Sequence, residues 1–373
     1  MPRKLFLPTL AIALVISVAS LLLSPLLALW LPGSWKRHVY EELSFRVIAD
    51  QVLPASRDPE ETIQAAINYT RRHLWLFGDS QPYGGTALGY LVEGVGWCDY
   101  HAKVFCRLLA ARGLHARYDF LLDRQGISPH TVAEVYLNGK WRALDPFFDL
   151  IYANEADGWL ALEDVTPDLV EQLPVMGIIR EANAPLYESV QTIARRTFPL
   201  PHPPQRSDDF LTDRHVFDAI TDGYFSVLGS GFARWYQDQF LRGQLATMQD
   251  PLRRLWCMAR HYHLYRRLDE AEPYYRELLA QATWHRYRER VVLFYSRLLI
   301  CQRRFADAKQ LLQRFLPEDR DAPWLRFHLA LCCEGLGQPD EAVQHYHAYQ
   351  ELHGKKYCVE AVTRLKRLAS QRL

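Results

Sequence analysis

The first pattern along the chain is an unbroken apolar run near its N-terminus. No charged residue occurs from Leu5 to Trp35, and Leu10 to Trp30 alone is long enough to cross a hydrocarbon core of about 30 Å as a helix. A cleaved signal peptide has a shorter apolar region and a small-x-small cleavage site, whereas the nearest candidate, Ala28, is flanked by leucines. The run therefore predicts a single transmembrane helix within residues 1–36 that anchors the chain.

The charges beside this run bear on its orientation. Arg3 and Lys4 precede the run and Lys36 and Arg37 follow it, so the positive charges are nearly balanced on the two sides. A very short N-terminal tail commonly stays in the cytoplasm. We therefore expect a single-pass membrane protein whose body lies on the extracytoplasmic, periplasmic side.

Helical periodicity follows the anchor in two segments. From Asp58 to Leu76 apolar residues recur at helical spacing, and Asp58 is suited to cap the first turn. From Cys98 to Arg112 the apolar positions again recur at helical intervals, and Gly113 marks the end. Cys98 is therefore expected at the N-terminus of a helix.

Short strands follow this second helix. Residues Ala116 to Leu122 are apolar and aromatic, and residues 123–126 have the composition of a turn. Thr131 to Leu137 and Lys140 to Leu144 are two further strand-like runs, and Asn138-Gly139 between them is a strong hairpin signal. The order helix, strand, hairpin predicts an α+β domain in which a helix packs on an antiparallel sheet.

The sequence after about residue 255 repeats itself. Ala271, Ala308 and Ala342 each begin a helix after an acidic turn, at intervals of 37 and 34 residues. A larger apolar or aromatic residue follows each alanine by four positions and a small residue precedes it by twelve: Tyr275, Leu312, Tyr346 and Ala259, Ser296, Ala330. The best copy, Gly337 to Ala342, resembles a tetratricopeptide repeat, and a generic array of helical hairpins is the alternative interpretation.

Composition limits the possible functions. Apolar residues make up 49% and charged residues 23% of the chain, as in folded proteins, and a net charge of +1 does not favour a nucleic-acid partner. The seven cysteines are odd in number and dispersed, which is unlike a disulfide framework. Cys98 and His101 form a C-x2-H pair, but two ligands make a weak metal signal, so we expect neither a metal nor a cofactor.

Cys98 has the placement that a nucleophilic thiolate needs, because exposed N–H groups and the helix dipole at a helix N-terminus favour negative charge. A histidine must share its proton, and a carboxylate must orient the imidazole. If Asn138 and Gly139 form the loop, Val132 faces Asp145, and His130 lies on the same face as Asp145, roughly 7–8 Å away diagonally. This register selects His130 over His101 and His115 as the partner of Cys98.

The motifs around these residues resemble the transglutaminase-like superfamily over about residues 60 to 150. They are Gly96-Trp97-Cys98-Asp99-Tyr100, the helix exit Arg112 to Arg117, His130 with Glu134-Val135-Tyr136, and Gly139-Lys140-Trp141 followed by Asp145-Pro146. The resemblance implies a papain/transglutaminase-like fold in which Cys98 is the nucleophile, His130 the base and Asp145 the orienting carboxylate. Val132 departs from the pattern, because the family usually has an aromatic residue there.

The resemblance also implies an activity. Members of the family include cross-linking enzymes, peptidases, deamidases and amidases, and the active ones attack an amide carbonyl through a thioester. We expect a membrane-anchored acyltransferase or hydrolase of this kind acting on a protein or peptide, with an amine or water as acceptor. The backbone N–H of Cys98, with Trp97 or Gln81, is the candidate oxyanion donor. The alternative is a catalytically silent scaffold whose helical repeats bind a protein partner.

The whole chain is thus predicted to be an α+β catalytic domain plus an all-α helical-repeat domain behind one transmembrane helix. Four prolines between residues 199 and 204 cannot continue a helix or a central strand, which predicts a linker at 198–210. The predicted segments are the anchor at 1–36, the transglutaminase-like domain at 37–197, the linker, and the helical domain at 211–373.

Overall fold

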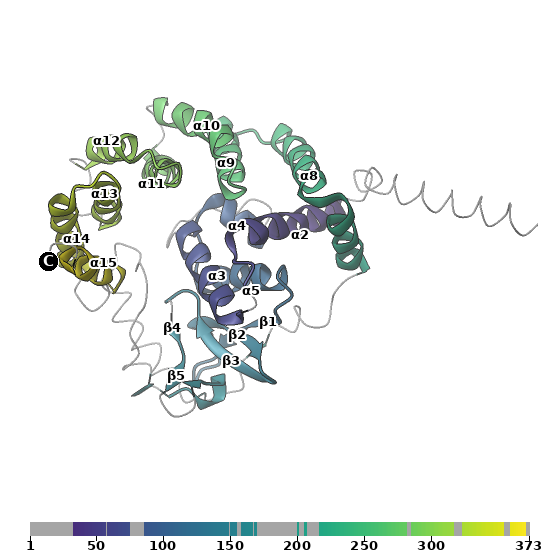
Figure 1. Ribbon diagram of the computed structural model, residues 1–373. Helices are drawn as coiled ribbons and strands as arrows, with labels where there is room; N and C mark the ends of the chain where they lie inside the picture. Colours follow the sequence, from purple (N-terminus) through teal and green to yellow (C-terminus); the bar gives the residue numbers. More distant parts are fainter. Residues whose placement is uncertain are drawn as a thin grey trace, which may run out of the picture. The chain divides into compact units, whose positions relative to one another are not determined.

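The structure is a computed structural model (Figure 1). It describes residues 33–56, 58–74, 86–148, 150–154, 158–166, 168–169, 200, 205–206, 216–281, 285–316, 323–353 and 359–370. The chain divides into two compact units, one made of residues 1–47 and 214–249 and the other of residues 48–213 and 250–373. The second unit therefore contains both the predicted catalytic residues and the predicted repeats.

The first unit is built from helices. Most of α2 (Gly33–Val52) and the whole of α8 (Val216–Ala246) belong to it, and α8 is kinked at Gly229, where the backbone is left-handed with φ 69°. The ring of Tyr40 in α2 stacks on that of Phe240 in α8, with the centroids 4.4 Å apart. The two helices therefore pack against each other through aromatic side chains.

No membrane span is found among the helices that the structure describes, because none of them combines enough length with enough apolar character. The predicted span from Leu10 to Trp30 lies outside the described residues. The anchor is therefore still a prediction.

The second unit contains a five-stranded antiparallel sheet with the order β4-β3-β2-β1-β7. Its strands are β1 (Ala116–Leu121), β2 (His130–Leu137), β3 (Lys140–Asp145), β4 (Leu150–Ile151) and β7 (Gln205–Arg206). A separate two-stranded ribbon joins β5 (Ala153–Asn154) to β6 (Gly158–Trp159). Strand β7 lies at the sheet edge inside the range predicted to be a linker, and an edge is where a proline-rich segment can still pair.

The hairpin of β2 and β3 has the predicted register. Asn138 and Gly139 form the two-residue turn with φ 51° and 82°, as a type I′ turn requires. Leu137 pairs with Lys140 and Tyr136 with Trp141. The start of β2 and the end of β3 therefore lie together at the end of the sheet opposite the turn.

Three helices pack beside this sheet: α3 (Pro59–His73), α4 (Ala87–Glu93) and α5 (Cys98–Ala110). Helix α5 packs on β1 and β2, and α3 and α4 contact α5 (Figure 1). The side chain of Asp58 caps α3 by accepting a hydrogen bond from the Glu60 N–H at 2.9 Å, as predicted. The core between α5 and the sheet includes Val104, Phe105 and Val135, all fully buried.

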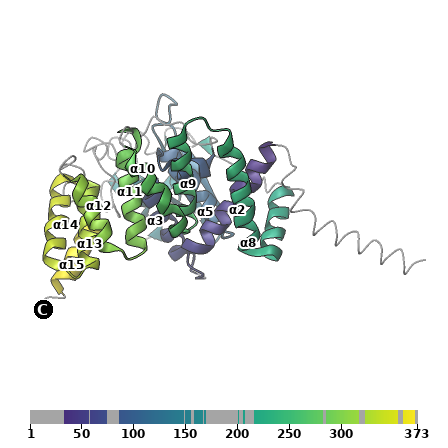
Figure 2. The same ribbon diagram turned by 90° about the horizontal axis from the view of Figure 1, so that it is seen from above.

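The C-terminal part of the second unit is an array of helices. They are α9 (Pro251–Leu264), α10 (Leu268–Ala280), α11 (His285–Cys301), α12 (Phe305–Phe315), α13 (Pro323–Gly335), α14 (Pro339–His353) and α15 (Val359–Ser370). Successive helices from α9 to α14 stand side by side (Figure 2). Ala271, Ala308 and Ala342 are fully buried, so close packing uses the repeated small residues.

The turns within this array share one geometry. Arg266, Arg303 and Gly337 each stand five positions before the repeated alanine, and each has left-handed backbone with φ 54°, 59° and 68°. The N–H of the following residue bonds the carbonyl five positions earlier in all three turns, at 2.9, 2.8 and 2.9 Å. This is the bond pattern of a Schellman turn, and only the third copy has the glycine that this conformation favours. The tetratricopeptide assignment is still a prediction.

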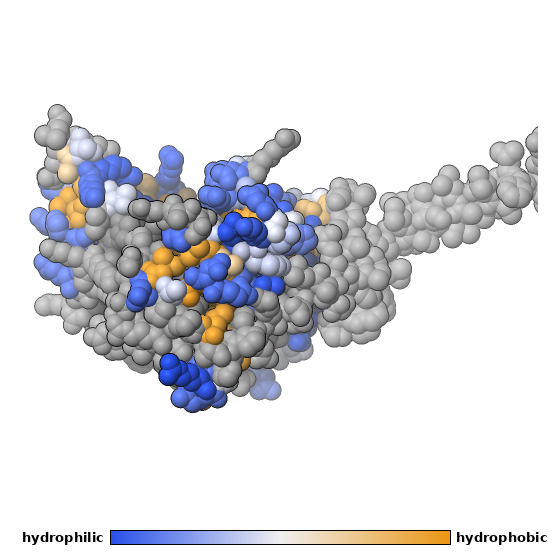
Figure 3. All heavy atoms as spheres, turned by 90° about the horizontal axis from the view of Figure 1, so that it is seen from below, coloured by the Kyte–Doolittle hydropathy of each residue, from blue (hydrophilic) through white to orange (hydrophobic). Residues whose placement is uncertain are grey.

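The surface of the described residues is mixed in character. In a space-filling view from below (Figure 3), hydrophobic residues appear at several places among hydrophilic ones, with the largest group near the middle of the view. Trp97 is one of the large hydrophobic residues with an exposed side chain, 49% of which is accessible. This exposed ring stands directly before Cys98 in the chain.

Candidate active site

The structure brings the three predicted catalytic residues together. Cys98 is the first residue of α5, His130 the first of β2 and Asp145 the last of β3. The Nε2 atom of His130 lies 2.6 Å from Oδ2 of Asp145, and both side chains are buried. The hairpin register thus places the imidazole and the carboxylate in direct contact.

The carboxylate of Asp145 is held on its other side by the backbone. Its Oδ1 atom accepts hydrogen bonds from the N–H groups of Phe147 and Phe148, at 2.9 and 3.0 Å. Aspartate commonly forms such turns with the N–H groups that follow it. Because both oxygens of Asp145 have donors, the carboxylate is fixed in one orientation toward His130.

The surroundings of His130 favour its charged form. Burial lowers the pKa of this imidazole, but the negative charges of Asp145 and Cys98, with hydrogen bonds to both, outweigh burial and raise the pKa from 6.5 to about 10. The rings of Phe147 and Phe148 lie 5.9 and 5.1 Å from the imidazole, measured between centroids. The raised pKa favours the imidazolium form of His130, whose ring is enclosed by aromatic rings.

Cys98 faces the same imidazole. It is a free thiol, partly buried, and its interaction with His130 is one of the influences that raise the pKa of that imidazole. Asp145 occupies Nε2, so Nδ1 is the ring nitrogen that is left for the thiol. His130 thus contacts Asp145 directly and interacts electrostatically with Cys98.

The N-terminal turn of α5 offers donors for a developing negative charge. The Trp97 carbonyl accepts the N–H groups of Tyr100 and His101, both at 3.1 Å, so the N–H groups of Cys98 and Asp99 stand at the open helix end. Trp97 is the residue that caps this helix, without a side-chain hydrogen bond. Gln81, the other oxyanion candidate, lies outside the described residues.

His101 belongs to the support of this turn. Its Nδ1 atom lies 2.9 Å from the Trp97 carbonyl oxygen, and its ring meets that of Phe147 edge to face at 5.0 Å. One ring nitrogen of His101, the histidine of the C-x2-H pair, is therefore already in contact with a backbone carbonyl. His101 links the turn before Cys98 to the residues that hold Asp145.

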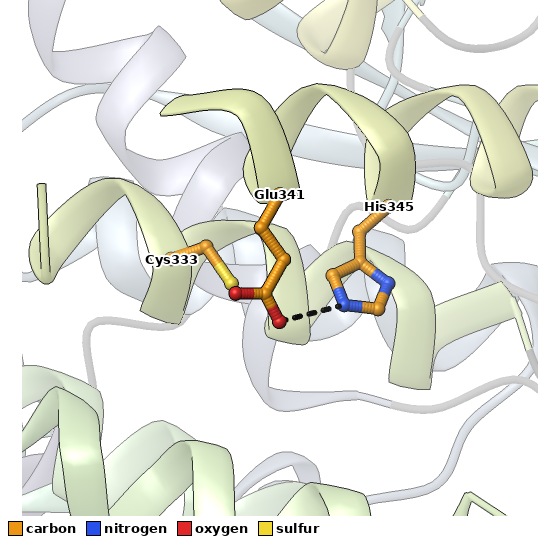
Figure 4. Close-up of side chains that lie close together, drawn as sticks. All are labelled: Cys333, Glu341 and His345. Atoms are coloured by element: carbon orange, nitrogen blue, oxygen red, sulfur yellow. Dashed lines mark ion pairs between the residues drawn. The ribbon is translucent and has the colours of Figure 1, made fainter. Parts of the chain in front are cut away.

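Another group of possible ligands lies in the helical array. Among the described residues, Cys333, Glu341 and His345 bring their ligand atoms within 4.8 Å of one another (Figure 4). The ammonium of Lys309 lies 2.6 Å from the Glu341 carboxylate and 2.9 Å from the amide oxygen of Gln338, to which it donates. Because the Glu341 carboxylate is already paired with this cation, the group is better described as an ion-pair network than as a metal centre.

A buried ion pair stabilises the sheet near the site. Arg117 in β1 and Glu134 in β2 are cross-strand partners, and Nε of the arginine donates to Oε2 of the glutamate at 2.7 Å. The guanidinium also lies over the ring of Trp141, 4.0 Å from its centroid. These residues join β1, β2 and β3 and do not contact Cys98, so we assign them to the scaffold.

A cavity of about 310 Å³ lies elsewhere in the same unit. It lies between α3 and the turn that joins α9 to α10, with Asn68, Arg72, Arg266 and Cys301 among its lining residues. Cys98, His130 and Asp145 do not line it. The cavity is therefore separate from the candidate active site.

One feature of the site was not predicted from the sequence. The N–H groups of Phe147 and Phe148 orient Asp145, and the signal for them is the aspartate followed at once by a proline turn. Val132, where the family usually has an aromatic residue, is fully buried. The side chain at this position therefore lies in the protein interior, and the His130–Asp145 contact is present with valine there.

Comparison with known proteins agrees with this geometry. A family model for the transglutaminase-like superfamily matches residues 46–146. This range includes Cys98, His130 and Asp145, so the chain contains a transglutaminase-like superfamily domain. No curated protein matches the chain, and no solved structure matches it.

Proposed function

We propose that this domain is a thiol-dependent acyltransferase or hydrolase that attacks an amide carbonyl of a protein or peptide. The observation that carries the proposal is the buried imidazole of His130, which contacts the carboxylate of Asp145 at 2.6 Å and whose pKa is raised by Asp145 and Cys98 together. A thiolate paired with an imidazolium is the form in which a cysteine attacks a carbonyl.

The proposed reaction proceeds in two steps. The Cys98 thiolate adds to the carbonyl carbon, and the oxyanion that forms is stabilised by N–H groups at the start of α5. The imidazolium of His130 gives its proton to the leaving amine as the carbon–nitrogen bond breaks, which leaves a thioester on Cys98. An amine or water then attacks the thioester and His130 accepts its proton. The carbon–sulfur bond breaks, which releases the acyl product and restores the Cys98 thiolate.

Asp145 and Trp97 have different parts in this scheme. Asp145 holds the imidazole so that Nδ1 faces the thiol, and it stabilises the positive ring. Trp97 presents an exposed aromatic ring beside Cys98, which suits contact with an apolar part of the substrate. Both acceptors, an amine for cross-linking and water for hydrolysis, are compatible with this arrangement.

A thiol-directed probe tests the proposal, because the described cysteines differ in exposure. Cys301 is exposed, Cys98 is partly buried, and Cys106, Cys257, Cys332 and Cys333 are buried. We expect an iodoacetamide or amide-based probe at about pH 6 to label Cys98 faster than Cys301, as located by peptide mass spectrometry, since only a stabilised thiolate reacts well in acid. Equal labelling of Cys98 and Cys301, or labelling that moves to Cys106, would exclude the thiolate.

The proposed cellular setting follows from the sequence. The apolar N-terminal run supports a membrane anchor with the domain on the extracytoplasmic side, and the helical array supports a protein partner. The competing function is a silent scaffold. Full biological function in a Cys98→Ala variant would favour the scaffold over the enzyme.

A further inference from the structure

The segment that leads into the candidate nucleophile is short and begins at α4. Glu93 ends this helix, Gly94 follows in left-handed conformation with φ 72°, and Cys98 begins α5 four residues later. So short a connection leaves little independent freedom. The position of the end of α4 therefore determines how Cys98 approaches His130.

Helix α9, from the C-terminal array, binds this end of α4 through a charged pair. Arg253 donates to Oε1 of Glu93 from Nε at 3.0 Å and from Nη2 at 2.7 Å. The Glu93 side chain is fully buried. A buried carboxylate depends on its cationic partner, because losing that partner leaves an uncompensated charge.

A second arginine of α9 joins α4 to α3. The Nη2 atom of Arg260 donates to the carbonyl of Leu91 at 2.8 Å and to that of His73 at 3.1 Å. Both carbonyls belong to the last turns of their helices, where acceptors have no partner within the helix and a positive charge is favourable. Arg260 is fully buried, so this connection is an internal part of the unit.

Helix α11 also contacts the end of α4. Nη1 of Arg290 lies 3.3 Å from the Glu93 carbonyl, and a Cβ atom built on Gly94 would lie 2.7 Å from the Phe294 ring. Gly94 therefore permits both the left-handed turn and the close approach of Phe294. Figure 1 shows α9 beside α4, in agreement with these contacts.

We propose that Arg253 and Arg260 are positioning residues for Cys98, and that helices α9 and α11 complete the candidate active site by fixing the end of α4. This inference rests on the proposed function. The helical array then acts as an internal support of the catalytic domain, in addition to any partner that it binds. Deleting the array would remove the support, so a truncated chain cannot separate catalysis from scaffolding.

The test measures the alkylation rate of Cys98 against pH in the full chain, with Arg253→Gln as the main variant. We expect its rate at about pH 6 to fall at least tenfold, because Cys98 no longer meets His130, while the rate at about pH 9.5, where any thiol ionises, stays within about threefold. Unfolding would give the same split, because it leaves Cys98 with an ordinary thiol pKa. The buried Cys106 must therefore stay protected from the probe in the variant, as in the wild type. Arg253→Lys, which keeps a cation beside Glu93, is expected to recover most of the rate at the lower pH.

Arg254→Gln is the matched control. Arg254 is the next residue of α9, its side chain is exposed, and it has no hydrogen bond or ion pair with α4 in the part of the chain that the structure describes. Equal profiles for the Arg253→Gln and Arg254→Gln variants would overturn the inference. If Arg253→Gln does not fold, Glu93→Gln is measured instead, because it keeps an oxygen that accepts from Arg253 and removes the buried negative charge. Equal profiles for Glu93→Gln and Arg254→Gln would then overturn the inference.

A second measurement separates this inference from the proposed function. Hydrogen exchange of residues 87–98 reports the mobility of α4 and of the segment before Cys98. A wild-type Cys98 that reacts no faster than Cys301 would defeat the proposed function alone. Unchanged exchange in Arg253→Gln would defeat the positioning by α9, whatever the chemistry of Cys98.

Discussion

Replacing Asp145 by asparagine tests the orientation of the candidate site most directly. The carboxylate accepts hydrogen bonds on both sides, from the N–H groups of Phe147 and Phe148 and from His130. An amide accepts on one side only. The asparagine must therefore either turn its NH2 group toward two backbone donors or turn it toward the imidazole.

The structure indicates which orientation wins. An NH2 group facing Phe147 and Phe148 would leave two buried N–H groups without acceptors, at about 1–3 kcal/mol each. The alternative places the NH2 group against Nε2 of His130, which must then be unprotonated. The single ring proton moves to Nδ1, so the imidazole becomes neutral and can no longer accept a proton from Cys98.

The expected size of the effect follows from the pKa of His130. Its rise from 6.5 to about 10 corresponds to roughly 4–5 kcal/mol in favour of the imidazolium, at about 1.4 kcal/mol per pKa unit. Asp145 and Cys98 supply the charges that cause the rise. Asp145 is the larger of the two charges that raise the pKa, and each pKa unit lost corresponds to about tenfold, so we expect the Asp145→Asn variant to lose roughly 10- to 100-fold in the alkylation rate of Cys98 near pH 6.

Asp123→Asn is the control for this substitution. Asp123 is a buried turn aspartate that also accepts two backbone N–H groups, from Gln125 and Ile127, both at 3.0 Å. Its replacement is expected to lower stability without changing the pH profile of Cys98. A wild-type profile in Asp145→Asn would refute the orientation by Asp145.

Three further outcomes are expected, each measured by urea unfolding. Because the pKa of His130 is raised on folding, its stabilising contribution is complete below about pH 6.5 and is lost as the pH rises through about 10, so wild type and His130→Gln should converge with rising pH. Glu134→Gln removes the nearer of the two carboxylates that pair with the buried Arg117 and leaves Asp119 at 3.8 Å, so it should cost about 3 kcal/mol, against less than about 0.5 kcal/mol for Glu270→Gln in an exposed pair. Arg303→Gly removes the strain of a non-glycine residue in left-handed backbone and should stabilise the folded protein by roughly 0.5–1 kcal/mol, whereas Arg303→Ala should not.

Much of the candidate site was predictable because its parts are local in sequence. The Asn138-Gly139 turn sets the register of β2 and β3, and register alone brings His130 next to Asp145. Periodicity and the glycine stop placed Cys98 at the start of α5. Each of these inferences uses fewer than twenty consecutive residues, over which backbone geometry is strongly constrained.

Other features had no local signal. The predicted linker gave no sign that Gln205 and Arg206 would pair with β1, since a two-residue edge strand leaves no periodicity. The closeness of Lys309 to Glu341 likewise depends on how α12 packs beside the next hairpin. Such contacts depend on the three-dimensional path of the chain.

The sequence by itself determined the elements of the transglutaminase-like domain and the pairing of His130 with Asp145, because turn chemistry and side-chain alternation act over a few residues. Only the tertiary structure decided that Cys98 and the imidazole interact electrostatically, since this depends on α5 packing on the sheet. It also decided that Arg253 binds Glu93 across 160 residues. Burial creates that contact, and no pattern along the chain encodes which distant charge a buried carboxylate will find.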